Sequence, residues 1–307
     1  RRQEFMTSVR SRTVFVHVAP ALFVFLWSTG YVGARFGLPF ADPFTLTSIR
    51  FAIVTAILTL VIVARRGKLP RTAQMWGHLA VSGLLIHACF IGGVFTAIDV
   101  GVNISIAALI AGTQPLLTAV IAVLFLGETL SARQWCGFVI GFMGLAMVVL
   151  KTIALDALPL VGLLGCLVGL CGITGGTLYQ KRFVVGLDLF TGSAIQFACA
   201  LIPCTLLAFL FESREIQWNL TVTLTLAWLC LVLSIGAISI LLFLIRAGAA
   251  SRVSSLFYLV PPVTAVQGYW FFGEKLDALQ IVGIAVAALG VALINYQPAA
   301  RQRAAAP

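Results

Sequence analysis

Ten long apolar runs, separated by short polar links, limit this chain to a small set of folds. A helix that crosses a bilayer needs about 20 mostly apolar residues. Only 10% of the residues are charged, whereas soluble proteins carry about 25%. The sequence therefore predicts an all-α polytopic membrane protein with ten transmembrane helices. We place these helices at residues 14–37, 43–63, 76–98, 101–125, 132–151, 157–181, 187–211, 221–245, 249–272 and 278–296.

The Lys and Arg residues gather in alternate links, and this bias predicts the orientation of the chain. If the N-terminus lies in the cytoplasm, the inner links and termini from Met6 onward hold thirteen Lys and Arg. The outer links hold four, namely Arg35, Lys151, Arg214 and Lys275. Cytoplasmic loops carry the excess of these residues. We therefore expect both termini in the cytoplasm, and a lipid bilayer, with no nucleic acid, as the partner of this basic chain.

One short phrase occurs twice, 146 residues apart. Phe125–Gln134 reads FLGETLSARQ, and Phe271–Gln280 reads FFGEKLDALQ. At the same offset, 14 of the 45 ungapped pairs between Asn103–Met147 and Ala249–Leu293 are identical. The matches include Pro, Gln, Glu and Gly, which apolar helices seldom share in register by chance. The sequence therefore predicts an internal duplication.

Each repeat holds five predicted spans, so the second repeat must enter the membrane from the opposite side. We divide the chain into residues 14–151 and 157–296, the second inverted, followed by a cytoplasmic tail at 297–307. Residues 1–5 precede Met6 and are interpreted as a cloning scar. Inverted repeats are typical of secondary transporters, with the substrate site near the midplane between the repeats.

Two prolines fall at equivalent places, Pro115 in the fourth span and Pro261 in the ninth. A proline inside a helix removes a backbone hydrogen bond and kinks the helix. The matched positions favour a hinge in each repeat, and a static kink used for packing is the alternative.

The repeated phrase also predicts how the fifth and tenth spans begin. Ser131 and Asp277 each precede a Gln by three residues, which is the spacing of a capping box. Glu128 and Glu274 lie just upstream, near the positive end of the helix dipole. We expect these four residues to shape the turns and not to contact substrate.

Several motifs, taken in order, make the chain resemble a known family. Leu26–Gly30 reads LWSTG, Asp42-Pro43 begins the second span, Arg50-Phe51 lies within it, and Gly-Glu follows the fourth and ninth spans. This order is similar to the EamA-type members of the drug/metabolite transporter superfamily, and most of all to bacterial inner-membrane exporters of aromatic amino acids and related metabolites. The resemblance implies a monomer or homodimer in which spans one to four and six to nine surround a central cavity, with spans five and ten outside.

A polar face of the first span is the predicted wall of that cavity. Ser28 and Tyr31 are three residues apart, on one side of a helix, and their equivalents in the second repeat are Thr174 and Thr177. Trp27 lies beside them and offers a stacking surface for a substrate side chain. Helix packing through Ser and Thr is the alternative interpretation.

Further polar residues lie inside the predicted spans. His87 is a candidate for substrate hydrogen bonding or proton transfer, or else it is satisfied by a neighbouring helix. Tyr258 precedes the Pro261 break and is placed at the cavity mouth. Arg50 has three open interpretations: it snorkels outward, pairs with an outer aspartate, or meets a substrate carboxylate. The intramembrane amides expected to join helices are Gln114, Gln196 and Gln267.

What the sequence lacks narrows the function. No Asp or Glu lies at the centre of a predicted span, and no Walker motif or H-E-x-x-H is present. No cysteine pair has the spacing of a metal site. We expect no enzyme activity, no cofactor and no metal. The prediction is an exporter of amino acids or related metabolites that works by alternating access. A multidrug, nucleotide-sugar or purine carrier of the same fold is the alternative, a channel is another, and an intramembrane enzyme is disfavoured.

Overall fold

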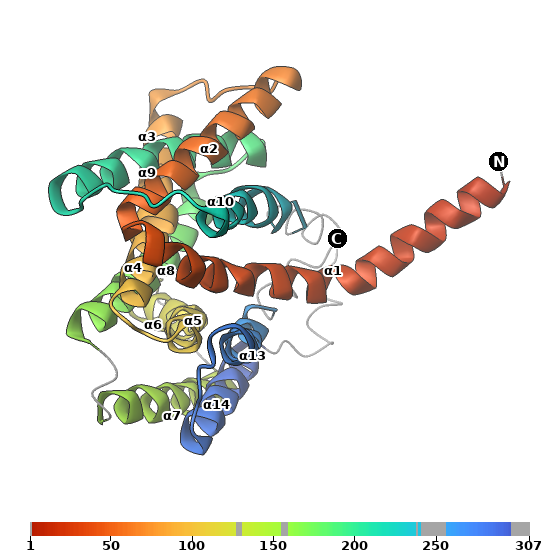
Figure 1. Cartoon of the computed structure of the whole chain (residues 1–307). Helices are drawn as coiled ribbons and strands as arrows, with labels where there is room; N and C mark the ends of the chain where they lie inside the picture. The colour runs from red at the N-terminus through yellow and green to blue at the C-terminus, as the bar shows by residue number, and fades with distance from the viewer. Residues whose placement is uncertain (1, 127–130, 155–158, 238, 241–255, 296–307) are drawn as a thin grey trace.

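The computed structural model describes residues 2–126, 131–154, 159–237, 239–240 and 256–295 (Figure 1). These residues form helices and no strand, apart from one isolated bridge between Ala41 and Ile216. The elements are α1 (Arg2–Gly37), η1 (Leu38–Phe40), α2 (Pro43–Ala64), α3 (Ala73–Gly83), η2 (Leu84–Cys89), α4 (Phe90–Asp99), α5 (Ile104–Gly112), α6 (Gln114–Leu126), α7 (Ala132–Ala154), α8 (Leu160–Phe183), α9 (Leu189–Phe211), α10 (Leu220–Ala227), η3 (Trp228–Ala237), η5 (Phe257–Leu259), α13 (Val260–Phe272) and α14 (Ala278–Asn295).

The predicted all-α membrane architecture is confirmed. Within the described residues, six helical segments are long and apolar enough to cross a membrane: Val18–Phe40, Pro43–Ala64, Ala73–Asp99, Leu160–Phe183, Leu189–Phe211 and Leu220–Ala237. Shorter apolar helices cover Ile104–Thr118, Ala132–Val148 and Ala278–Gly290. Large apolar side chains such as Trp270 and Phe211 are exposed on the outside, where a bilayer would cover them. The exact number of ten spans stays a prediction.

The internal repeat is visible in the helix boundaries. The starts of α2 and α9, of α6 and α13, and of α7 and α14 are each 146 residues apart. The third span contains the π-helical segment η2, and the corresponding span of the second repeat contains the π-helical segment η3. Such π-helical turns are rare and frequently occur at functional sites.

Equivalent helices of the two repeats pack directly against each other. In Figure 1, α7 and α14 lie side by side at one edge of the molecule, and α2 and α9 lie together at another. Glycines allow the first pair to touch through backbone: a Cβ added to Gly144 would lie 2.6 Å from Gly283 O. Likewise, a Cβ on Gly290 would lie 2.6 Å from Gly137 O. Positions that rise along α7 therefore meet positions that fall along α14, so the two equivalent helices are antiparallel.

The fourth and ninth spans are broken, but not as mid-helix kinks. The fourth divides at Thr113 into α5 and α6, and Pro115 is the second residue of α6. In the ninth, the short 3-10 helix η5 leads into α13, and Pro261 is the second residue of α13. A proline in the first turn of a helix breaks no hydrogen bond, because that N–H has no intrahelical partner. The prolines therefore start new helices, which corrects the expected mid-helix kinks.

Candidate functional site

Three aromatic rings, which we call the His87 stack, lie together where α2, η2 and α9 meet. Phe51 of α2 and Phe197 of α9 are equivalent residues of the two repeats, and their ring centroids are 5.3 Å apart. His87 of η2 stacks on Phe197 at 4.0 Å with an interplanar angle of 21°, and lies edge-on to Phe51 at 6.0 Å. Offset and edge-on arrangements are the favoured geometries of aromatic pairs. His87 therefore stacks at the contact between the two repeats.

A polar residue precedes each phenylalanine of this stack, and these two residues are also equivalent. Gln196 precedes Phe197, and its Nε2 donates to Ser82 Oγ at 2.9 Å and to Gln180 Oε1 at 3.0 Å. Arg50 precedes Phe51, and its Nη2 donates to Ser234 Oγ at 3.1 Å. Gln196 thus contacts α3, which leads into the π-helical segment η2, and Arg50 contacts the π-helical segment η3. Arg50 and Gln196 are equivalent positions, but only Arg50 carries a charge.

Arg50 is buried in this arrangement, with 4% of its surface exposed. It does not snorkel to the surface, and no Asp or Glu among the described residues forms an ion pair with it. Asp42, an aspartate on the predicted outer side, accepts hydrogen bonds from the backbone N and the Oγ of Ser213. Contact between Arg50 and a substrate carboxylate stays a prediction. The signal in the sequence was a basic residue within a long apolar run.

The predicted polar faces of the first and sixth spans are turned inward but satisfied locally. Ser28 Oγ donates to Phe25 O at 2.8 Å, and Thr174 Oγ1 donates to Leu170 O at 2.7 Å. Thr177 Oγ1 accepts from Gln114 Nε2 at 2.9 Å, which joins α8 to α6. No hydrogen bond among the described residues links these groups to His87. Their role in substrate binding stays a prediction.

The aromatic candidates lie apart from the His87 stack. Trp27 packs between Phe23 and Phe257, with centroid distances of 5.5 and 5.2 Å. Tyr31 is buried in the larger apolar cluster together with Phe23. The backbone of Tyr258 lies in η5, but the contact predicted for its side chain falls outside the described atoms. The sequence therefore marked one aromatic cluster on α1 and missed a second, formed by α2, η2 and α9.

Two carboxylates on the predicted outer side cap helices of distant spans. Glu212, at the end of α9, accepts from the backbone N atoms of Phe44 and Thr45 in α2, both at 2.7 Å. Glu274, after α13, accepts from Ile104 N and Ser105 Oγ at the start of α5, both at 3.0 Å. Anionic groups stabilise helix N-termini because the unpaired N–H groups there carry partial positive charge. Glu274 was expected to shape its own turn, and instead it ties α13 to α5.

The predicted capping boxes are present. Ser131 N donates to Gln134 Oε1 at 2.9 Å, and Gln134 N donates back to Ser131 Oγ. Asp277 and Gln280 exchange the same two hydrogen bonds at the start of α14, at 3.0 and 2.8 Å. Glu128 lies outside the described residues.

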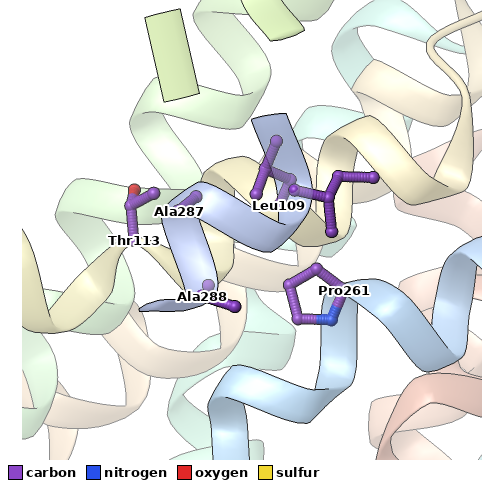
Figure 2. A pocket seen from close by; sticks show the side chains of 7 residues that line it. Leu109, Thr113, Pro261, Ala287 and Ala288 are labelled. Atoms are coloured by element: carbon purple, nitrogen blue, oxygen red, sulfur yellow. The ribbon is translucent and has the colours of Figure 1, made fainter. Parts of the chain in front are cut away.

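A small cavity lies where α5, α13 and α14 meet, next to the Pro261 junction. Figure 2 shows Leu109, Thr113, Pro261 and two alanines around it. Its volume is about 10 Å³, which is at the lower limit for a single water. The cavity is too small for a metabolite and marks an imperfect fit at the broken spans. Among the described residues, no group of three His, Cys, Asp or Glu side chains is placed to hold a metal ion.

The EamA-like transporter family model matches the sequence twice, at residues 16–150 and 160–296. The two matches together span nearly the whole chain.

Curated relatives are similar over most of their length. An "Uncharacterized transporter YvbV" of Bacillus subtilis is 26% identical, and the match covers 93% of each chain. An "Uncharacterized inner membrane transporter YedA" of Escherichia coli is 26% identical over 90% of this chain and 88% of its own length. A "Probable amino-acid metabolite efflux pump" of Salmonella typhimurium is 24% identical over 88% and 91%. One solved crystal structure has the same fold, with a TM-score of 0.61 and 20% identity over 91% of this chain and 96% of that one.

Proposed function

We propose that this chain, which belongs to the EamA-like transporter family, exports amino acids or related small metabolites across a bacterial inner membrane by alternating access. The observation that carries the proposal is the packing of equivalent helices of the two repeats. Where α2 meets α9, Phe51 lies on Phe197, and the residues before them are Arg50 and Gln196. Inverted repeats bind substrate at their interface near the membrane midplane. The relative named as an amino-acid metabolite efflux pump supports the substrate class.

The central aromatic and polar groups supply the contacts that a small metabolite needs. His87, Phe51 and Phe197 offer flat apolar surfaces, and Arg50 and Gln196 offer hydrogen-bond donors. In this proposal, the walls of the cavity also include the residues expected from the sequence, namely Trp27, Ser28, Tyr31, Thr174, Thr177 and Tyr258. Small-molecule sites commonly combine apolar walls with a few well-placed polar groups.

The outer carboxylates supply a means of closing one side of the carrier. Glu274 holds the start of α5 against the end of α13, and Glu212 holds the start of α2 against the end of α9. Each contact joins one repeat to the other. We infer that these ties break when the carrier opens outward, while the broken spans at Pro115 and Pro261 provide the hinges.

Uptake of labelled compounds into proteoliposomes tests the function. A panel of the common amino acids, a nucleotide sugar, a purine and a cationic drug is presented to vesicles that contain the purified chain. We expect saturable flux of one or more amino acids. Flux of the drug, purine or nucleotide sugar alone would replace the substrate class, and the family's transport activity would stand.

A further inference from the structure

Arg50 is a buried charge that the fold leaves without a counter-charge. Its guanidinium carries five N–H donors, and Ser234 Oγ is the acceptor that the structure gives it, at 3.1 Å. Its Nε is buried without a hydrogen-bond partner. Ser234 in turn donates to Leu229 O at 3.0 Å, so the acceptor is a neutral hydroxyl.

A buried charge destabilises the fold unless an opposite charge or a set of hydrogen bonds compensates it. Charged side chains within a bilayer are rare, and they pair with one another or mark a substrate pathway. The groups around Arg50 are aromatic or neutral: Phe51 follows it in α2, and Cys230 Sγ contacts its backbone O at 3.8 Å. The described residues therefore hold a cationic site and lack the anion that would match it.

The equivalent position of the second repeat carries no charge. The equivalent residue, Gln196, makes two hydrogen bonds from its Nε2 and carries no charge. Both residues donate to a serine hydroxyl of another span, and in the second repeat a neutral amide makes this contact. Of the two equivalent positions, only Arg50 carries a charge.

More unpaired polar atoms lie on the same helix. Thr47 Oγ1, Ser48 Oγ and Thr55 Oγ1 of α2 are buried without a hydrogen-bond partner. Thr47 precedes Arg50 by three residues, so the two side chains share a face of the helix. Its hydroxyl is fully buried and is able to donate to an anion that Arg50 holds.

We propose that Arg50 binds the carboxylate of the transported substrate, with the Thr47 hydroxyl as a second donor. The planar guanidinium matches a carboxylate with two parallel hydrogen bonds. This inference rests on the proposed function and narrows it to metabolites that carry a carboxylate. In this proposal, Phe51, Phe197 and His87 contact the rest of the substrate. Arg50 of α2 is buried against η3, so the substrate reaches it when η3 moves away from α2. The π-helical turn of η3 is suited to such a movement.

Pairs of compounds that differ only in the carboxylate test this site. The purified full chain in detergent is unfolded by heat with phenylacetate or phenylacetamide, L-phenylalanine or its amide, and L-leucine or its amide. We expect stabilisation by at least one acid at concentrations tenfold or more below those at which its amide acts. Equal stabilisation by acid and amide, or no stabilisation by any acid, would overturn the proposal.

Variants of Arg50 test the residue itself. Arg50→Gln should abolish the preference for acids, and Arg50→Lys should weaken acid binding about tenfold, because a lysine cannot form the paired hydrogen bonds. Arg65→Gln is the matched control, since Arg65 lies at the exposed end of the same helix, and it should keep the preference. An acid preference that persists in Arg50→Gln would contradict the proposal. If Arg50→Gln does not fold, Arg50→Lys and the acid and amide pairs on the unaltered chain still decide.

The two proposals fail differently. Amino-acid flux that Arg50→Gln leaves unchanged would remove the carboxylate site and retain the exporter. Acid binding that depends on Arg50, together with no amino-acid flux, would remove the amino-acid exporter and retain the carboxylate site.

Discussion

Phe51 and Phe197 occupy equivalent positions of the two repeats, and their ring centroids lie 5.3 Å apart. Two equivalent residues of a duplicated chain touch only where the axis that relates the copies passes between them. The packing of α7 on α14 follows the same symmetry, because a Cβ on Gly144 would meet Ala287 and a Cβ on its equivalent, Gly290, would meet Gly141, the equivalent of Ala287. The axis therefore crosses the molecule between α2 and α9 and between α7 and α14, and the His87 stack lies beside it.

Glu274→Ala should open the outer side of the protein. The carboxylate ties α13 to α5 through two hydrogen bonds at 3.0 Å, and a charge-assisted bond is worth about 1.5–3 kcal/mol. We expect labelling of a cysteine at Ile104 by a membrane-impermeant maleimide to rise about tenfold or more, in a background without the native cysteines. Asp277→Ala is the control in the same loop, because Asp277 caps α14. Unchanged labelling in Glu274→Ala would show that this tie does not close the outer side.

Gly144→Ala should destabilise the packing of α7 on α14. The added methyl would lie 2.6 Å from Gly283 O and 2.8 Å from Ala287 Cα, and backbone atoms cannot move aside as a flexible side chain does. We expect a loss of roughly 1–3 kcal/mol, measured as a lower thermal unfolding temperature in detergent. Gly175→Ala, in α8 with nothing within 4 Å of the added carbon, should be neutral or slightly stabilising. Equal effects of the two changes would argue against a close α7–α14 contact.

Gly112→Ala should impair transport more than stability. A Cβ at Gly112, the end of α5, would lie 2.9 Å from Pro261 Cγ, so it presses on the start of α13 where the hinge is proposed. We expect a severalfold lower transport rate while the protein still folds. Gly77→Ala in α3, with open space around the added carbon, should transport normally. Transport by Gly112→Ala at the rate of Gly77→Ala would remove the hinge at this junction.

His87→Ala and His87→Phe together separate two roles of the histidine. The ring stacks on Phe197 at 4.0 Å, so a phenylalanine retains the flat surface and an alanine removes it. We expect His87→Ala to lower transport tenfold or more and His87→Phe to retain most of it at equal expression. An inactive His87→Phe would assign a hydrogen-bonding or proton-transfer role to the imidazole instead.

The local features were predictable from the sequence. Apolar runs, the 146-residue offset and the capping boxes at Ser131 and Asp277 depend on residues close together in the chain or on self-similarity. The position of the helix breaks was less accessible, because Pro115 is compatible both with a kink and with the start of a helix. Only the backbone at Thr113 distinguishes these two arrangements.

The long-range contacts could not be predicted in the same way. Glu274 meets Ile104 from 170 residues away, and Arg50 meets Ser234 from 184 residues away. A single sequence gives the type of each residue but not which of many helices it faces. Once the duplication is known, however, the Arg50 and Gln196 equivalence is visible, and the unbalanced charge is a signal that the sequence alone contains.

Alternating access is tested most directly by counterflow. Proteoliposomes are loaded with an unlabelled amino acid that the chain transports, and entry of the same amino acid in labelled form is followed from a dilute external solution. A carrier exchanges substrate across its two orientations, so the labelled compound should accumulate transiently inside, several times faster than in empty vesicles. Entry at the same rate with and without internal substrate would contradict alternating access and indicate a channel.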